Sequence, residues 1–287
     1  MYRVPMRLTL FALCLTLAAC SGSPKPDPAP EAAPPASGAG APDDIGFAPV
    51  LPIRIDEVKH TDAHVDGLIA TLKTLVSKQT DASKWQKDAG IHFWRLQNRL
   101  ERGRLSADQE ARVVAAIDQM AAAHPDAKAY LDHRKWMVQH LAVGKAAPEI
   151  VGKDFDDAEF TLSETRGKVT LVVFTGEWCG PCRSEYPYQR LMLELYKDKP
   201  FAIVGINSDA KLDVARKGKI DSRLPYRSWW DGYAAKNTEG PIATAWGVTG
   251  WPTMYLLDKE GVIRFAGLRQ EDLLKAVSQL MAEKATE

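Results

Sequence analysis

Two cysteines separated by a Gly-Pro dipeptide are the residues of this chain best suited to covalent chemistry. Residues 178–182 read W-C-G-P-C and directly follow the apolar run 169–174. Cysteines three apart meet on one face of the first turn of a helix, where a disulfide can close. The unpaired amides and the dipole at a helix start stabilise a thiolate on the leading cysteine. The spacing therefore predicts a redox disulfide that takes part in thiol–disulfide exchange, with Cys179 as nucleophile and Cys182 as resolving partner.

A zinc site is the main alternative for such a cysteine pair. Structural zinc takes four ligands, but the only other cysteines are Cys14 and Cys20, and no histidine follows His140. A purely structural disulfide is a second alternative, although so short a loop restricts the unfolded chain little. We therefore expect a redox pair with both sulfurs near the surface, no metal and no other cofactor.

Composition limits the kinds of partner. The 287 residues carry 37 basic and 37 acidic side chains, so the formal net charge is zero. A balanced chain lacks the basic footprint of a nucleic-acid-binding protein, and we expect no nucleic acid partner. With 45% hydrophobic residues, the chain can bury the core of one ordinary domain and carry a second element.

The N-terminal residues have the pattern of an export signal. Basic residues precede the apolar stretch 8–19, which is too short to span a bilayer. Residues 17–20 read L-A-A-C and resemble the bacterial lipobox. The resemblance implies that 1–19 is a lipoprotein signal peptide and that Cys20 is acylated. Ser21 at the next position suggests, by resemblance to Gram-negative lipoproteins, sorting to the outer membrane facing the periplasm. A plain signal peptide with a coincidental cysteine is the alternative.

Composition then divides the rest of the chain into three parts. Residues 20–52 are rich in Pro and Ala and hold little to bury, as expected of a tether. Residues 53–143 carry apolar side chains at helical spacing, and 144–287 alternate strand and helix patterns. The helical part is either a packing domain or spacer, or a dimerisation or substrate-presenting surface, and the sequence does not separate these.

Four helices are expected in the helical part. Apolar stripes over 65–76 and 85–100 predict the first two. Ser106 with a glutamine three residues on resembles a capping box that starts the third helix, which His-Pro at 124–125 ends. Asp126 is expected to cap the fourth.

The C-terminal part predicts a mixed sheet flanked by helices. Short apolar runs bounded by turn formers indicate buried strands, and amphipathic stretches indicate helices. The expected strands are 169–174, 201–207, 253–258 and 262–267, with helices from 179 to about 196 and over 270–284.

Three motifs of this part carry a family resemblance. They are G-K-A-A-P-E at 144–149, R-G-K-V at 166–169 and W-C-G-P-C-R-S-E-Y-P at 178–187. Together they are similar to the TlpA-like (ResA-like) thiol-disulfide oxidoreductases of the thioredoxin superfamily. The resemblance covers 144–287 and implies an α/β thioredoxin-like fold in that segment.

The resemblance also implies a substrate-binding surface. Residues 250–253 read G-W-P-T and look like the family's cis-proline loop. Gly250, Trp251 and Pro252 are then expected beside the sulfurs together with Trp178, where the backbone of Trp251 pairs with an extended substrate. The pair Trp229-Trp230 is expected near the same cleft, with at least one ring in the core.

A proton acceptor is implied in the same way. Glu185, one helical turn past Cys182, matches an acidic residue that assists proton transfer in TlpA-like proteins. Pro187 matches the proline that kinks the active-site helix. Val173 stands where cytosolic thioredoxins keep a buried aspartate, so that relay is absent here. Glu177 is expected to be exposed.

The predicted function is reduction of protein disulfides in the cell envelope. The Gly-Pro dipeptide is what reducing members of the superfamily carry, so a membrane thiol-reductant shuttle is the expected electron donor and a lipid anchor the expected membrane contact. A Cu(I)-handling thiol module and a redox-responsive binding protein remain alternatives. A thiol peroxidase is disfavoured because no P-x-x-x-T-x-x-C arrangement surrounds Thr175 and Cys179.

Overall fold

Every element described below lies in one compact unit, Ala48–Glu287. The computed structural model describes residues 58–77, 103–232 and 240–283. The predicted signal peptide, Cys20, the tether and the helix expected over 85–100 lie outside the described residues. Within those ranges, no helix has both the length and the apolar character that a membrane span needs.

The helical part packs three described helices around one apolar cluster. They are α1 (Asp62–Ser77), α4 (Ala107–Ala123) and α5 (Lys128–His140). Strands β1 (Val58–Lys59) and β2 (Gly103–Arg104) pair in parallel beside them. The cluster contains Val65, Leu68, Leu72 and Val76 of α1, Val113, Ile117 and Met120 of α4, and Leu131 and Val138 of α5. The stripe predicted for the first helix is therefore its buried face.

The capping box predicted at Ser106 is confirmed, whereas the predicted cap at Asp126 is wrong. The Ser106 hydroxyl accepts the Gln109 amide at 3.2 Å, and the Gln109 side chain accepts the Ser106 amide at 3.0 Å. After His124 the chain forms a 3₁₀ turn, η2 (Pro125–Ala127). Asp126 lies within this turn and not at the N-cap position of α5. Helix α5 then follows Ala127 with no side-chain cap.

Replacing Ser106 by alanine is expected to lower the free energy of unfolding by about 1 kcal/mol, because the backbone amide of Gln109 at the start of α4 loses its side-chain acceptor. Denaturant unfolding checks the loss. Ser77→Ala is the matched control, because Ser77 is exposed in the last turn of α1 and caps no helix start. An equal loss in both variants would contradict the cap's contribution.

The C-terminal part is built on a five-stranded mixed sheet of order β7-β6-β5-β8-β9, so the predicted α/β thioredoxin-like fold is confirmed. Strands β5, β6 and β7 are parallel to one another, while β8 is antiparallel to both of its neighbours, β5 and β9. The strands are β5 (Val169–Thr175), β6 (Phe201–Asn207), β7 (Ser228–Trp230), β8 (Thr253–Leu257) and β9 (Ile263–Ala266). The four predicted strands match four of these to within one residue at each end.

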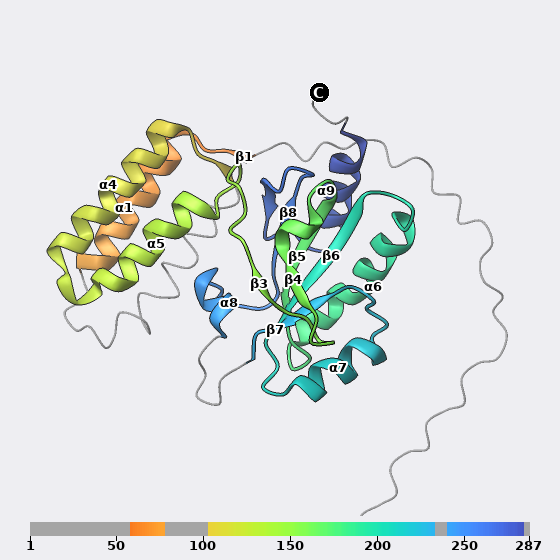
Figure 1. Cartoon of the computed structure of the whole chain (residues 1–287). Helices are drawn as coiled ribbons and strands as arrows, with labels where there is room; N and C mark the ends of the chain where they lie inside the picture. Colours follow the sequence, from red (N-terminus) through yellow and green to blue (C-terminus); the bar gives the residue numbers. More distant parts are fainter. Residues whose placement is uncertain (1–57, 78–102, 233–239, 284–287) are drawn as a thin grey trace, which may run out of the picture. The chain divides into compact units, whose positions relative to one another are not determined.

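Helices and a hairpin cover the two faces of the sheet (Figure 1). Side chains alternate along β5, so Leu171 and Val173 face a cluster with α6 and α9, while Val172 and Phe174 face a cluster with α8. The helices are α6 (Gly180–Leu195), α7 (Leu212–Asp221), α8 (Pro241–Ala245) and α9 (Gln270–Ala282). The hairpin of β3 (Val151–Lys153) and β4 (Glu159–Thr161) leads into η3 (Leu162–Thr165).

The end of α5 joins the core of the sheet. Met137 and Leu141 belong to the same apolar cluster as Trp246, which follows α8. The Lys145 ammonium also lies 2.6 Å from the Glu110 carboxylate of α4. Apolar side chains before and after residue 143 thus pack in one core. The domain boundary expected between 53–143 and 144–287 stays a prediction.

Candidate functional site

The cysteine pair lies where β5 gives way to α6, as predicted. Cys179 and Cys182 form a disulfide, with Cα atoms 5.2 Å apart. Cys179 is the N-cap residue of α6, and its sulfur accepts the Cys182 amide at 3.1 Å. Pro181 in the first turn has no amide to satisfy. The leading sulfur therefore lies at the amide-rich start of a helix, where negative charge is stabilised.

The two sulfurs are less accessible than expected. Cys179 is 5% exposed and Cys182 only 1%, so the expectation that both lie near the surface is wrong. The cause is packing, because the face of α6 that carries Cys182 also carries Tyr186 into the core of the sheet. Cys179 is the more exposed of the two, which is the order expected of a nucleophile and a resolving cysteine.

The segment that follows β6 holds the cysteine loop in position. The Asp209 carboxylate accepts the Glu177 amide at 3.0 and 3.2 Å and the Asn207 side-chain amide at 2.7 Å. The Ser208 amide donates to the Thr175 carbonyl at 2.9 Å. Sequence reasoning missed these residues. The available signal was an Asn-Ser-Asp run directly after a buried parallel strand, at the sheet edge where ligands bind.

Two tryptophan side chains are anchored on Ser208. The Trp178 indole N–H donates to the Ser208 carbonyl at 3.4 Å, and the Trp251 indole N–H donates to the Ser208 hydroxyl at 3.0 Å. Their ring centroids are 5.5 Å apart in an edge-to-face arrangement. The structure thus brings Trp178 and Trp251 together beside the cysteine loop, as expected.

The loop before β8 has the predicted backbone. The peptide bond between Trp251 and Pro252 is cis, and the Thr253 hydroxyl donates to the Gly250 carbonyl at 2.8 Å. The Arg269 guanidinium donates to the Pro252 carbonyl, a contact that sequence reasoning missed because Arg269 lies beyond β9. That Gly250, Trp251 and Pro252 contact substrate stays a prediction.

Glu185 lies one turn past Cys182 and is buried. Its carboxylate accepts the Gln270 amide at the start of α9, at 2.9 Å. This contact joins α6 to α9. Its part in catalysis stays a prediction.

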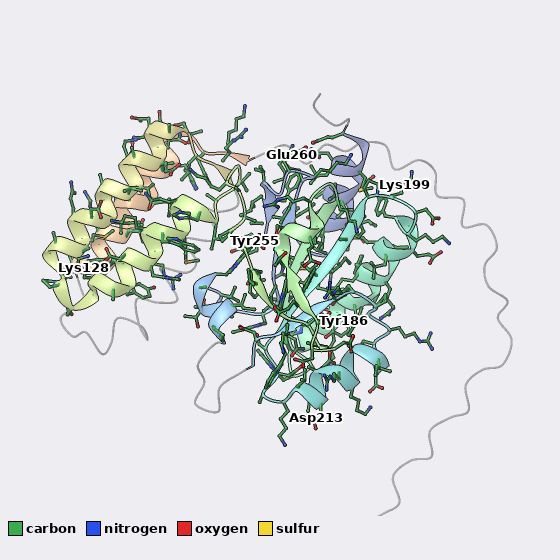
Figure 2. The ribbon with its side chains drawn as sticks, in the orientation of Figure 1. Lys128, Tyr186, Lys199, Asp213, Tyr255 and Glu260 are labelled. Carbon is green, nitrogen blue, oxygen red and sulfur yellow. A yellow bond between two sulfur atoms is a disulfide. The ribbon has the colours of Figure 1, made fainter. Side chains whose placement is uncertain are left out.

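Glu177 is half-buried, so its expected exposure is wrong. Helix α7 packs against the Glu177 side chain at Gly218. The contact is so close that a Cβ added to Gly218 would collide with the Glu177 side chain. The Tyr186 hydroxyl, labelled in Figure 2, donates to its carboxylate at 2.8 Å. Burial raises the pKa of Glu177 above its usual range, and the nearby Asp209 carboxylate adds to the rise.

The raised pKa makes a pH-dependent effect on stability testable. The folded protein binds the Glu177 proton more tightly than the unfolded chain does. The free energy of unfolding therefore falls as pH rises from 4.5 through the folded-state pKa and the carboxylate ionises. Glu177→Gln removes that penalty while its amide oxygen still accepts the Tyr186 hydroxyl. We expect the variant to melt a few degrees higher than the native protein at about pH 7, with no gain at about pH 4.

Thermal melts of the Gln variant and the native protein at both pH values measure this difference. The matched control is Glu260→Gln, because Glu260 is exposed in the turn between β8 and β9 (Figure 2). A gain of equal size at both pH values would contradict a titrating carboxylate at Glu177.

The sheet, the cis-proline loop and the buried cysteine pair at a helix start define a thioredoxin-like thiol-disulfide oxidoreductase. Residues 143–266 match the AhpC/TSA family. The chain is 30% identical over 128 residues to thiol-disulfide oxidoreductase ResA of Bacillus thuringiensis subsp. konkukian (strain 97-27), covering 44% of this chain and 69% of that protein. The chain belongs to the ResA family of thiol-disulfide oxidoreductases and is an enzyme of thiol–disulfide exchange.

Two further similarities were found. The ResA protein of Geobacillus thermodenitrificans (strain NG80-2) is 30% identical over 126 residues, 43% of this chain and 68% of that protein. Among solved structures, the thioredoxin domain of a thiol-disulfide oxidoreductase from Bacteroides vulgatus is 28% identical, with a TM-score of 0.45, covering 49% of this chain and 99% of that domain. The AhpC/TSA match begins at residue 143 and gives no information about the helical part.

Proposed function

We infer that the protein reduces disulfides of other proteins in the cell envelope. The observation that carries the inference is the Cys179–Cys182 disulfide at the start of α6, where Cys179 is the N-cap residue and is slightly more exposed (5%) than Cys182 (1%). The Gly-Pro dipeptide between them, typical of reducing members of the superfamily, supports the direction. The similarity to the ResA thiol-disulfide oxidoreductases supports the chemistry.

Reduction proceeds by two exchanges. The Cys179 thiolate attacks one sulfur of the substrate disulfide, forms a mixed disulfide and releases the other sulfur as a thiolate. Cys182, deprotonated with help from Glu185, then attacks the Cys179 sulfur. The second substrate thiol leaves, two electrons have passed to the substrate, and the protein holds the Cys179–Cys182 disulfide. Trp178, Gly250, Trp251 and Pro252 align the substrate chain beside Cys179.

A reductant must then restore the thiols. We assign this step to a membrane thiol-reductant shuttle. In this proposal an acyl chain on Cys20 anchors the protein in the outer membrane facing the periplasm, and residues 20–52 connect the anchor to the folded part. These assignments rest on the lipobox-like residues 17–20 and on the need for a donor.

The reduction potential of the Cys179–Cys182 pair tests the direction of electron flow. The purified protein is equilibrated in dithiothreitol or glutathione redox buffers, and its free thiols are counted. A potential near or below about −270 mV is expected of a reductase, whereas a value near about −120 mV would make the protein an oxidant.

A further inference from the structure

Two exposed indole rings are bonded to the segment after β6 that supports the cysteine loop. Trp178 is 53% exposed and Trp230, the last residue of β7, is 41% exposed. Trp229, the residue before Trp230, is fully buried and its ring stacks on Phe160. The two adjacent tryptophans therefore lie in different environments, one in the core and one at the surface. Large aromatic rings are rarely left in water, and grouped ones mark interaction sites.

Three indoles share one anchor. Trp178 and Trp251 donate to Ser208, and the Trp230 indole N–H donates to the Asp209 carbonyl at 2.7 Å. The rings therefore come from three separate segments but are fixed on two consecutive buried residues. Because the only polar atom of each indole is already bonded to this anchor, the exposed ring surface is carbon.

The polar groups beneath the rings are also occupied. The Asp209 carboxylate accepts the Glu177 and Asn207 amides. The Arg183 guanidinium, at the start of α6, donates to the Glu177 carbonyl at 3.0 Å. A visiting peptide thus meets carbon surface at the rings rather than open hydrogen-bonding groups, and aromatic side chains gain from packing against such rings.

We propose that Trp178, Trp230 and Trp251 form an aromatic ridge that selects protein disulfides flanked by apolar or aromatic residues, with Trp230 as a specificity-determining residue supplied by β7. The inference rests on the proposed reductase function and names the substrate class of the same site. Apolar residues beside a disulfide are accessible mainly in chains that are not fully folded, so incompletely folded proteins are the substrates that the ridge favours.

Two peptides with the same disulfide test the ridge. One carries phenylalanine on both sides of each cysteine and the other carries serine, a neutral reference that Arg183 does not attract. The pre-reduced full chain is mixed with each peptide in a single turnover. We expect a second-order rate constant about tenfold higher for the phenylalanine peptide. Trp230→Ala is expected to reduce this preference to about twofold or less, and Trp230→Phe to retain most of it.

The control variant is Ile220→Ala, because Ile220 is 74% exposed on α7 and lies outside the ridge. It is expected to keep the native preference. Equal rates of the native protein on both peptides would overturn the ridge while leaving the reductase function intact. Reduction of neither peptide would overturn the proposed function and the ridge with it. A full preference in Trp230→Ala would remove Trp230 from substrate selection.

Discussion

Replacing Cys182 by serine is expected to trap a substrate protein on Cys179. The first exchange needs only the Cys179 thiolate, whereas release needs the Cys182 sulfur. The backbone amide of Cys182 lies 3.1 Å from the Cys179 sulfur. With Cys182 replaced, the protein lacks the thiol that would attack the mixed disulfide. The mixed disulfide therefore accumulates. Non-reducing gels and mass spectrometry of the adduct, lost on adding dithiothreitol, measure it.

The matched variant Cys179→Ser is expected to form no adduct and to lose at least about a thousandfold in turnover, because the nucleophile is gone. The two serine variants differ only in which sulfur remains, so the comparison assigns the roles. Adduct formation through Cys182 in the Cys179→Ser variant would reverse the assignment and contradict the burial argument.

The central strands and the cysteine helix were predictable because their signals are local. Residues 169–174 and 201–207 are unbroken apolar runs, the pattern of parallel strands buried on both faces. The W-C-G-P-C run brings its own helix start, with a proline that needs no amide partner. The Ser106 capping box is likewise complete within four residues. Each of these elements can be predicted from a few adjacent residues.

The parts that could not be predicted depend on distant segments. Asp209 supports the cysteine loop only because the pairing of β5 and β6 sets their ends side by side. Glu177 is half-buried because α7 lies across it through Gly218. Arg269 reaches Pro252 from beyond β9. The sequence pattern within each of these segments does not indicate such contacts. The cysteines were therefore predictable from the sequence, and the groups that position them were not.

Glu185→Gln is expected to slow substrate release about a hundredfold near neutral pH and to leave formation of the mixed disulfide unchanged. The glutamine oxygen can still accept the Gln270 amide, so the contact between α6 and α9 persists. In the proposed mechanism, what the side chain loses is the capacity to take a proton from Cys182. The defect is expected to shrink as the solution becomes basic, because a thiol then ionises without the help of a carboxylate.

Stopped-flow measurement of both phases across pH separates this proton transfer from a loss of packing. Glu194→Gln is the control, because Glu194 is exposed on the same helix and pairs with Lys197. It is expected to change neither phase. A packing defect would slow both phases at every pH, whereas a missing proton acceptor slows only the second and is relieved as the solution becomes basic. An unchanged release phase would assign the proton to solvent, the remaining acceptor in a chain that has Val173 at the usual relay position.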